Sequence, residues 1–303
     1  MQSWFMVAAL FAMALVGSAN AATGATLKVD HASVCGSSLP ALQQAFSSIG
    51  LAPTYGGPHG NGVTQMALLG FEDGSYLELI APQKAGVVEG SPWAKLMAGD
   101  AGACAWAIGS EDIQKDVDRL KKLSLGAKGP EPGSRKKPDG TVIEWQTASL
   151  GPGSPGATLP FMIQDKTPRS LRVQPSASVK HSGLTGVEVV VLAVNDLQAA
   201  VGRFRRAFAL AAPTVEEHKE FGAKLAYFPG TPVMLAEPLD NTSWLAERLV
   251  KFGESPVAYL LGTEHLAVAT KRYSLSSETK WFGRNLAWFD AGKLEGLRLG
   301  VIQ

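Results

Sequence analysis

The pattern that most constrains the fold is a short apolar run, an amphipathic helical stretch and further short apolar runs, repeated along the chain. The first unit opens with a strand-like segment at 29–36. A helix follows, capped by Ser38 and stopped by Gly50, and then two strands near 64–70 and 75–81. A unit of this kind cannot bury its own sheet face alone. The repetition therefore predicts units packed in pairs.

Three more units are visible. They begin near residues 104, 187 and 257, and the last of them is the least regular. We expect an α+β fold of about four βαβββ modules, paired into two curved mixed-sheet half-barrels that each leave a concave cleft.

The composition of two stretches predicts connecting segments between structural elements. The Pro-, Gly- and Lys-rich residues 129–140 predict a solvated loop, and the Ser-, Pro- and Lys-rich stretch from Pro168 to Gly186 predicts an interdomain linker. The expected domains are therefore a paired-module domain at 27–169 and a second, degenerate paired-module domain at 184–303.

The chain opens with a segment typical of export. An apolar run from Trp4 to Val16 precedes Ala19 and Ala21, which form an A-x-A cleavage pattern. The run is shorter than the ~20 residues that cross a bilayer. We interpret residues 1–21 as a signal peptide and expect an exported protein, periplasmic or secreted, with no stable membrane insertion after signal removal.

Charge and cysteine content limit the partners and the compartment. The chain has 28 basic and 27 acidic residues, a net charge of +1, so no basic patch for nucleic acid stands out. A small-molecule ligand or substrate is the expected partner, and no nucleic acid is expected. Cys35 and Cys104 can pair in an oxidising compartment or remain buried thiols, and the sequence leaves both open.

His31 and Glu78 lie in two of the apolar runs of the first unit. Alternate residues of a strand point to one face, so the two side chains can converge on one cleft. The chain here resembles glyoxalase-like domains of the vicinal oxygen chelate superfamily. The resemblance spans about 27–169 and is carried by the segments Leu27–His31, Tyr76–Pro82, Thr141–Trp145, Leu159–Ile163 and Thr167–Arg169.

The resemblance implies a divalent metal ion of unknown identity, held by His31 and Glu78, that polarises vicinal oxygens of a small molecule. The second module, however, offers Cys104 or its neighbours where a further ligand is expected, and its strand at 159–164 has no carboxylate. The third module has Val189 and Met234 at the ligand positions. The second half is therefore expected to be structural or to shape the ligand site.

Two further residues are candidates for catalysis. His59 lies in a Gly-rich loop and is interpreted as a proton-transfer or gating group, or else as a solvated residue of a surface turn. Glu144 is a possible general base or additional ligand, or an outward-facing carboxylate, because it and Trp145 must face opposite sides of their strand. Trp106 either stacks on a planar substrate or packs in the core.

These observations favour an exported metalloenzyme with lyase, isomerase or oxygenase (dioxygenase) chemistry on a small oxygenated or aromatic molecule. The alternative is a metal-free protein that sequesters a small molecule in a cleft of the same shape. A structural or partner-binding module is a third possibility. The fold class does not choose among them, since this superfamily supports many reactions.

Overall fold

The computed structural model describes residues 27–303, so the predicted signal peptide at 1–21 lies outside the described residues. The first half contains β1 (Val29–Cys35), α1 (Leu39–Ser48), β2 (Thr54–Pro58), β3 (Thr64–Gly70), β4 (Tyr76–Pro82), α2 (Ala94–Ala98), β5 (Gly102–Gly109), α3 (Ile113–Lys122), β6 (Lys128–Lys136), β7 (Val142–Ser149), β8 (Phe161–Asp165) and α4 (Arg169–Arg172). The second half contains β9 (Leu184–Ala193), α5 (Leu197–Phe208), β10 (Thr214–His218), β11 (Ala223–Tyr227), β12 (Val233–Pro238), α6 (Trp244–Phe252), β13 (Ser255–Thr263), α7 (Leu266–Tyr273), β14 (Thr279–Trp281), β15 (Arg284–Trp288) and β16 (Arg298–Ile302).

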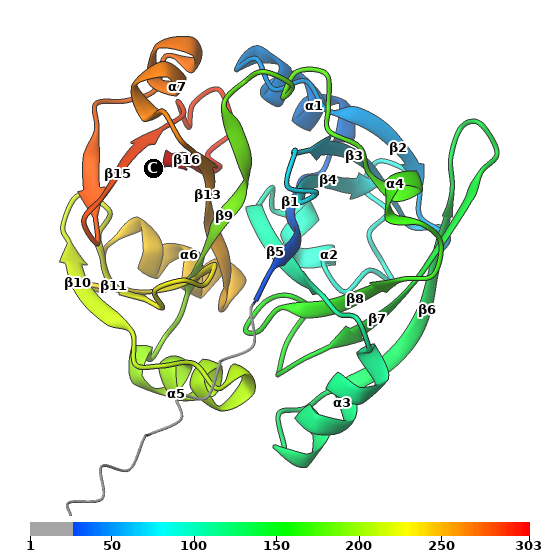
Figure 1. The fold of residues 1–303 in the computed structure, drawn as a ribbon, viewed down its shortest axis with the longest axis horizontal. Helices are drawn as coiled ribbons and strands as arrows, with labels where there is room; N and C mark the ends of the chain where they lie inside the picture. Colours follow the sequence, from blue (N-terminus) through cyan, green and yellow to red (C-terminus); the bar gives the residue numbers. More distant parts are fainter. Residues whose placement is uncertain (1–26) are drawn as a thin grey trace, which may run out of the picture.

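Each half forms one eight-stranded mixed sheet with the same internal order. The first sheet runs β2-β3-β4-β1-β5-β8-β7-β6 and the second runs β10-β11-β12-β9-β13-β16-β15-β14. In both, the first strand pairs parallel to the last strand of its own module and antiparallel to the first strand of the next. Figure 1 shows the two sheets side by side, each strongly curved. The predicted α+β class with repeated βαβββ modules is confirmed.

The two edges of the first sheet lie close together. The edge strands β2 and β6 nearly meet: His59 bridges to Arg135, and the Gly60 N–H donates to the Ser134 carbonyl at 3.1 Å. These contacts satisfy edge groups that would otherwise be unpaired. The first sheet is thus nearly closed around its hollow.

The helices form where the sequence places caps and apolar faces. The Ser38 side chain accepts from the Ala41 N–H at the start of α1, and the Asp112 side chain caps α3 in the same way. Their apolar faces are buried against the sheet. Among the described residues, none of the helices has the length and apolarity needed to cross a bilayer.

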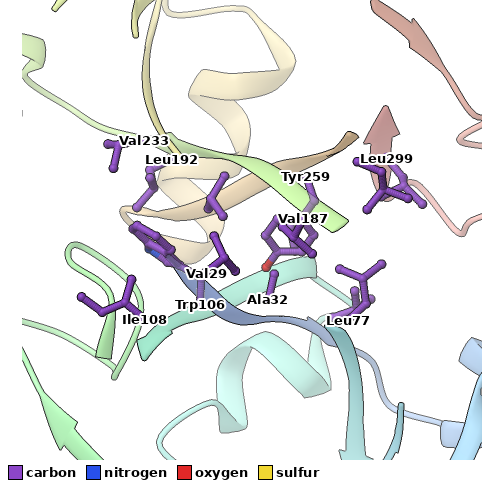
Figure 2. Packing of buried hydrophobic residues seen from close by; sticks show 14 of the residues in the cluster. Val29, Ala32, Leu77, Trp106, Ile108, Val187, Leu192, Val233, Tyr259 and Leu299 are labelled. Atoms are coloured by element: carbon purple, nitrogen blue, oxygen red, sulfur yellow. The ribbon is translucent and has the colours of Figure 1, made fainter. Parts of the chain in front are cut away.

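The core lies between the convex faces of the two sheets, where β1 and β5 face β9 and β13 (Figure 1). Figure 2 shows Trp106 and Tyr259 in this layer. The Tyr259 hydroxyl lies 2.7 Å from the Ser33 carbonyl oxygen and 2.9 Å from that of Ala105, and it accepts from the Cys104 N–H at 3.2 Å. A residue of the second half therefore completes the hydrogen bonding of strands in the first.

The hollow of the second sheet is filled by side chains. Phe221 is 4% exposed and lies at its centre. It packs edge-on against Trp244 and Trp281 and stacks on Trp288, with centroid distances of 5.2, 4.9 and 5.8 Å. Val189 and Met234, at the positions expected for metal ligands, belong to the same apolar cluster. This filling explains why the second half offers no polar centre there.

The prediction of a solvated loop at 129–140 is wrong in part, whereas the predicted linker does join the two sheets. Residues 129–136 of the expected loop belong to β6, because this segment pairs with β7 and closes the first sheet near β2. The stretch at 168–186, expected as a linker, is packed: Arg172, Val179 and Ser182 are buried.

Cys35 and Cys104 form a disulfide, with a Cα separation of 5.8 Å. The two residues lie on β1 and β5, which are adjacent antiparallel strands, so the fold brings them within bonding distance. The bridge links the first strands of the two modules beneath the hollow of the first sheet.

Candidate functional site

His31 and Glu78 share the inner face of the nearly closed sheet. β1 and β4 pair in parallel, with His31 opposite Tyr76 and Ser33 opposite Glu78. His31 and Glu78 are therefore diagonal neighbours on one face. Their Nε2 and Oε2 atoms are 3.8 Å apart, and both side chains are almost completely buried.

His59 joins this pair from the edge of the sheet. It follows β2, and a tight turn folds it inward. The side-chain oxygen Oδ1 of Asn61 holds this turn by accepting from the Val63 and Thr64 N–H groups. Its Nε2 lies 3.3 Å from Glu78 Oε1. The two imidazoles thus approach different oxygens of one carboxylate.

Each imidazole is oriented by a hydrogen bond at its Nδ1 atom. His31 Nδ1 lies 2.7 Å from Asp30 Oδ1, and His59 Nδ1 lies 2.8 Å from Thr64 Oγ1. A carboxylate can only accept, so His31 carries its proton on Nδ1 and turns Nε2 toward Glu78. Asp30 reaches His31 because the register of β1 against β5 shifts between Val29 and His31, a bulge that breaks strict alternation.

Asp30 is itself held by two arginines from the segment after β8. Arg172 donates to Asp30 Oδ1 at 2.9 Å and to Oδ2 at 2.8 Å, and Arg169 also donates to Oδ2. Both arginines in turn contact Asp165. Burial acts to raise the pKa of Asp30, but the hydrogen bonds from Arg172 and His31 outweigh it and hold the pKa far below its ordinary value. Asp30 is therefore a fixed anion.

Glu78 is also ionised. Burial acts to raise its pKa, but His59, His31 and the Ser33 hydroxyl, which donates at 3.1 Å, together lower the pKa to about 2. The phenol of Tyr76 shows the opposite trend, since burial raises its pKa. Tyr76 Oη accepts from Arg172 at 2.7 Å. At neutral pH the site thus holds a carboxylate beside a neutral phenol.

These groups line a cavity of about 400 Å³ inside the first sheet. A volume of this size suits a small organic molecule. Both polar and apolar side chains line the cavity. The lining residues are His31, His59, Gly60, Asn61, Met66, Leu68, Tyr76, Glu78, Trp93, Pro132, Gly133, Ser134, Arg135, Trp145, Thr147, Phe161, Ile163 and Arg172.

The structure brings together three of the four residues singled out in the sequence, His31, His59 and Glu78. It does not bring Glu144 to them: this side chain is exposed, and its neighbour Trp145 lines the cavity instead. Trp106 is completely buried between the sheets and is not a cavity residue. Both placements follow from strand alternation, which puts one of two neighbours on each face.

Sequence reasoning missed Asp30, Tyr76, Arg135 and Arg172. Asp30 and Tyr76 had a signal, because a polar residue beside a candidate ligand in an apolar strand requires a partner. Arg135 and Arg172 had none, since both lie in stretches whose composition is typical of loops. Only the pairing of distant strands reveals their place.

The nitrogen and oxygen atoms of His31, His59 and Glu78 are of the kinds that bind metal ions, although they do not surround a common point closely enough to chelate one. Two imidazole nitrogens and a carboxylate, each imidazole with a hydrogen bond at its other nitrogen, match the surroundings of metal ligands. Among the described residues, no three His, Cys, Asp or Glu side chains already form a group close enough to chelate an ion. Cys104 offers no thiolate, because it is bridged to Cys35.

Comparison with known proteins agrees with the fold. A glyoxalase-like domain family matches residues 29–191, more than half of the chain. A hypothetical protein from Staphylococcus aureus has a TM-score of 0.57 at 14% identity, over 91% of this chain and 98% of that one. A variant of 4-hydroxymandelate synthase from Streptomyces coelicolor has a TM-score of 0.61 at 14% identity, over 92% of each chain. No curated protein matches the sequence.

At 14% identity the two solved structures show the fold alone. The extent of the family match settles membership, and it confirms the resemblance found in the sequence. This chain belongs to the glyoxalase-like domain family.

Proposed function

We propose that the protein is a glyoxalase-like enzyme that acts on a small oxygenated molecule with the help of a divalent metal ion held by His31, His59 and Glu78. The observation that carries this proposal is the orientation of the two imidazoles. Each turns Nε2 toward the same buried carboxylate while Nδ1 is held by another side chain. Pre-oriented donors of this kind are what a metal centre requires.

His59 would supply the ligand that the second module lacks. The His31 Nε2 to Glu78 Oε2 distance of 3.8 Å is somewhat longer than two donors on one ion usually show, so both side chains would have to move closer together to hold an ion. When bound, the ion would polarise adjacent oxygens of the substrate and stabilise the negative charge that develops on them.

The remaining residues shape the reaction space. Trp93, Trp145 and Phe161 would exclude water from one side of the substrate, which strengthens electrostatic interactions in the cavity. Tyr76 would keep its proton, because burial raises its pKa, and would donate a hydrogen bond to a substrate oxygen while accepting one from Arg172. Asp30 would fix the His31 tautomer.

Metal analysis tests the proposal. The protein is purified without chelator or affinity metal, and its divalent ions are measured by mass spectrometry. We expect about one ion per chain in the wild type and loss of most of it in His31→Ala. His265→Ala is the matched control, since that imidazole is exposed in the second half. A wild-type protein without a stoichiometric ion, even after incubation with divalent metals, contradicts the proposal.

A second candidate function is metal-free sequestration of a small molecule. It is favoured by the hydrogen bonds that Glu78 already has from Ser33 and His59, and by the disulfide at the ligand position of the second module. In the experiment above, a metal-free protein that still binds ligands in the cavity supports this reading.

We also propose that the protein is exported to an oxidising compartment. The apolar N-terminal run with its A-x-A pattern and the Cys35–Cys104 disulfide support this together. Mass spectrometry of the protein recovered from cell fractions checks it. Detection of an intact N-terminus in the cytoplasmic fraction alone contradicts export.

A further inference from the structure

Arg135 is a buried cation at the cavity whose charge has no acidic partner among the described residues. Its side chain is 5% exposed, and it lines the cavity. Nη1 donates to the Gly56 carbonyl and Nη2 to the Arg172 carbonyl at 2.5 Å. Burial of an unpaired guanidinium is costly, and carbonyl groups compensate for only part of it.

The other charges around the cavity are balanced locally. Arg169 and Arg172 are paired with Asp30 and Asp165. Glu78 is the remaining anion, and it is surrounded by His31, His59 and Ser33 rather than by Arg135. Among the charged residues that line the cavity, Arg135 is therefore the cation without an ion-pair partner.

Three aromatic side chains also line the cavity. Trp93 and Phe161 have ring centroids 6.3 Å apart, and Trp145 lines the same cavity. The Trp93 indole N–H already donates to the Pro155 carbonyl at 2.9 Å, so this ring presents an apolar surface to the ligand. Met66 and Leu68 extend the apolar lining from β3.

We propose that the ligand is an aromatic carboxylate, with the carboxylate bound by Arg135 and the ring placed against Trp93, Trp145 and Phe161. A guanidinium offers parallel donors that fit the two oxygens of a carboxylate, and the anion would neutralise the buried charge. Aromatic rings contribute further by stacking. This assignment rests on the proposed function for the site, whose chemical preference it specifies.

Calorimetric titration with two matched probes tests it. The protein, treated with chelator, is titrated with 3-phenylpropionate and with its neutral amide, 3-phenylpropanamide. We expect the acid to bind at least about tenfold more tightly than the amide. Equal affinities, tighter binding of the amide, or no binding of either probe overturns the proposal.

Variants of Arg135 test whether this residue causes the preference for the acid over the amide. Arg135→Gln is expected to remove the advantage of the acid over the amide, while Arg135→Lys keeps part of it. Lys136→Gln is the matched control, because it removes the same charge from the next, exposed position of β6. An acid preference that survives in a folded Arg135→Gln protein contradicts the role of Arg135. Should that variant fail to fold, the wild-type probe pair and Arg135→Lys decide the matter.

The two proposals fail in different ways. Because the titration is done without metal, an absent ion leaves the acid preference in place and refutes only the metal-dependent function. A stoichiometric ion together with equal affinities for the two probes refutes only the aromatic carboxylate.

Discussion

At the scale of single residues, the site consists of charges fixed by their neighbours. Asp30 holds His31, Arg172 holds Asp30, and Asp165 contacts Arg172. A buried network in which each member has a partner is rigid, since any rotation leaves a polar group unsatisfied. Glu78 lines the cavity beside His31 and Arg172, and its ionisation links the site to stability.

The ionisation of Glu78 gives a pH dependence with a defined sign. Its pKa in the folded protein is about 2, below the ~4.3 of an unfolded glutamate. The stabilisation is therefore fully present above about pH 5 and is lost as the pH falls toward 2. We expect Glu78→Gln to flatten the decline of unfolding free energy below pH 5 by up to about 1.4 kcal/mol per pH unit.

Urea unfolding at several pH values, in chelator, measures this slope. Glu144→Gln is the control, because it neutralises an exposed carboxylate on β7. Identical slopes for wild type and Glu78→Gln show that Glu78 is not held ionised by its neighbours.

How much of the site the sequence could predict depends on the range of the interaction. His31 and Glu78 could be predicted from the sequence, because strand alternation and the spacing of two apolar runs place them on one face. Asp30 was hidden by a bulge, which no local pattern specifies. Arg135 was hidden by composition: Pro and Gly on both sides of it indicate a loop, and only pairing with β7 makes a strand.

At the scale of elements, β1 and β5 organise the first half. They are the central strands of its sheet, and they carry the disulfide on the cavity side of the sheet. Helices α1 and α3 were predictable from their caps and apolar faces. The weak strands β2, β10 and β14 were not, because short, partly exposed edge strands lack a continuous apolar pattern.

Removal of the disulfide measures its contribution. The bridge closes a loop of 69 residues, which corresponds to about 4 kcal/mol of unfolded-state entropy. We expect Cys35→Ser with Cys104→Ser to lower the unfolding free energy by about 2–4 kcal/mol, measured by urea denaturation. Reduced wild-type protein should behave like the double variant. A double variant as stable as the oxidised protein contradicts this role.

At the scale of the whole molecule, the two sheets share one core rather than forming independent bodies. Apolar residues of both halves belong to the same buried cluster. The Tyr259 hydroxyl extends from β13 to the backbone of β1 and β5. The repeated units in the sequence predicted the paired sheets, but not that one hollow is filled while the other stays open.

Tyr259→Phe tests the coupling between the halves. The change leaves the Cys104 N–H without its acceptor in a fully buried place, which costs about 1–3 kcal/mol of unfolding free energy. Chemical denaturation measures the loss. The control is Tyr55→Phe, whose hydroxyl is exposed and which should change stability by less than about 0.5 kcal/mol. Equal effects of the two changes contradict the coupling.

The seam between β2 and β6 has a consequence for how the cavity works. His59 lies on one side of this seam and Arg135 on the other. If the two strand edges separate, the imidazole and the guanidinium both move away from the cavity, one with each edge. A ligand that contacts both side chains would hold the two strand edges together. Ligand binding would then favour the closed arrangement of β2 and β6, and that arrangement would in turn raise the affinity for the ligand.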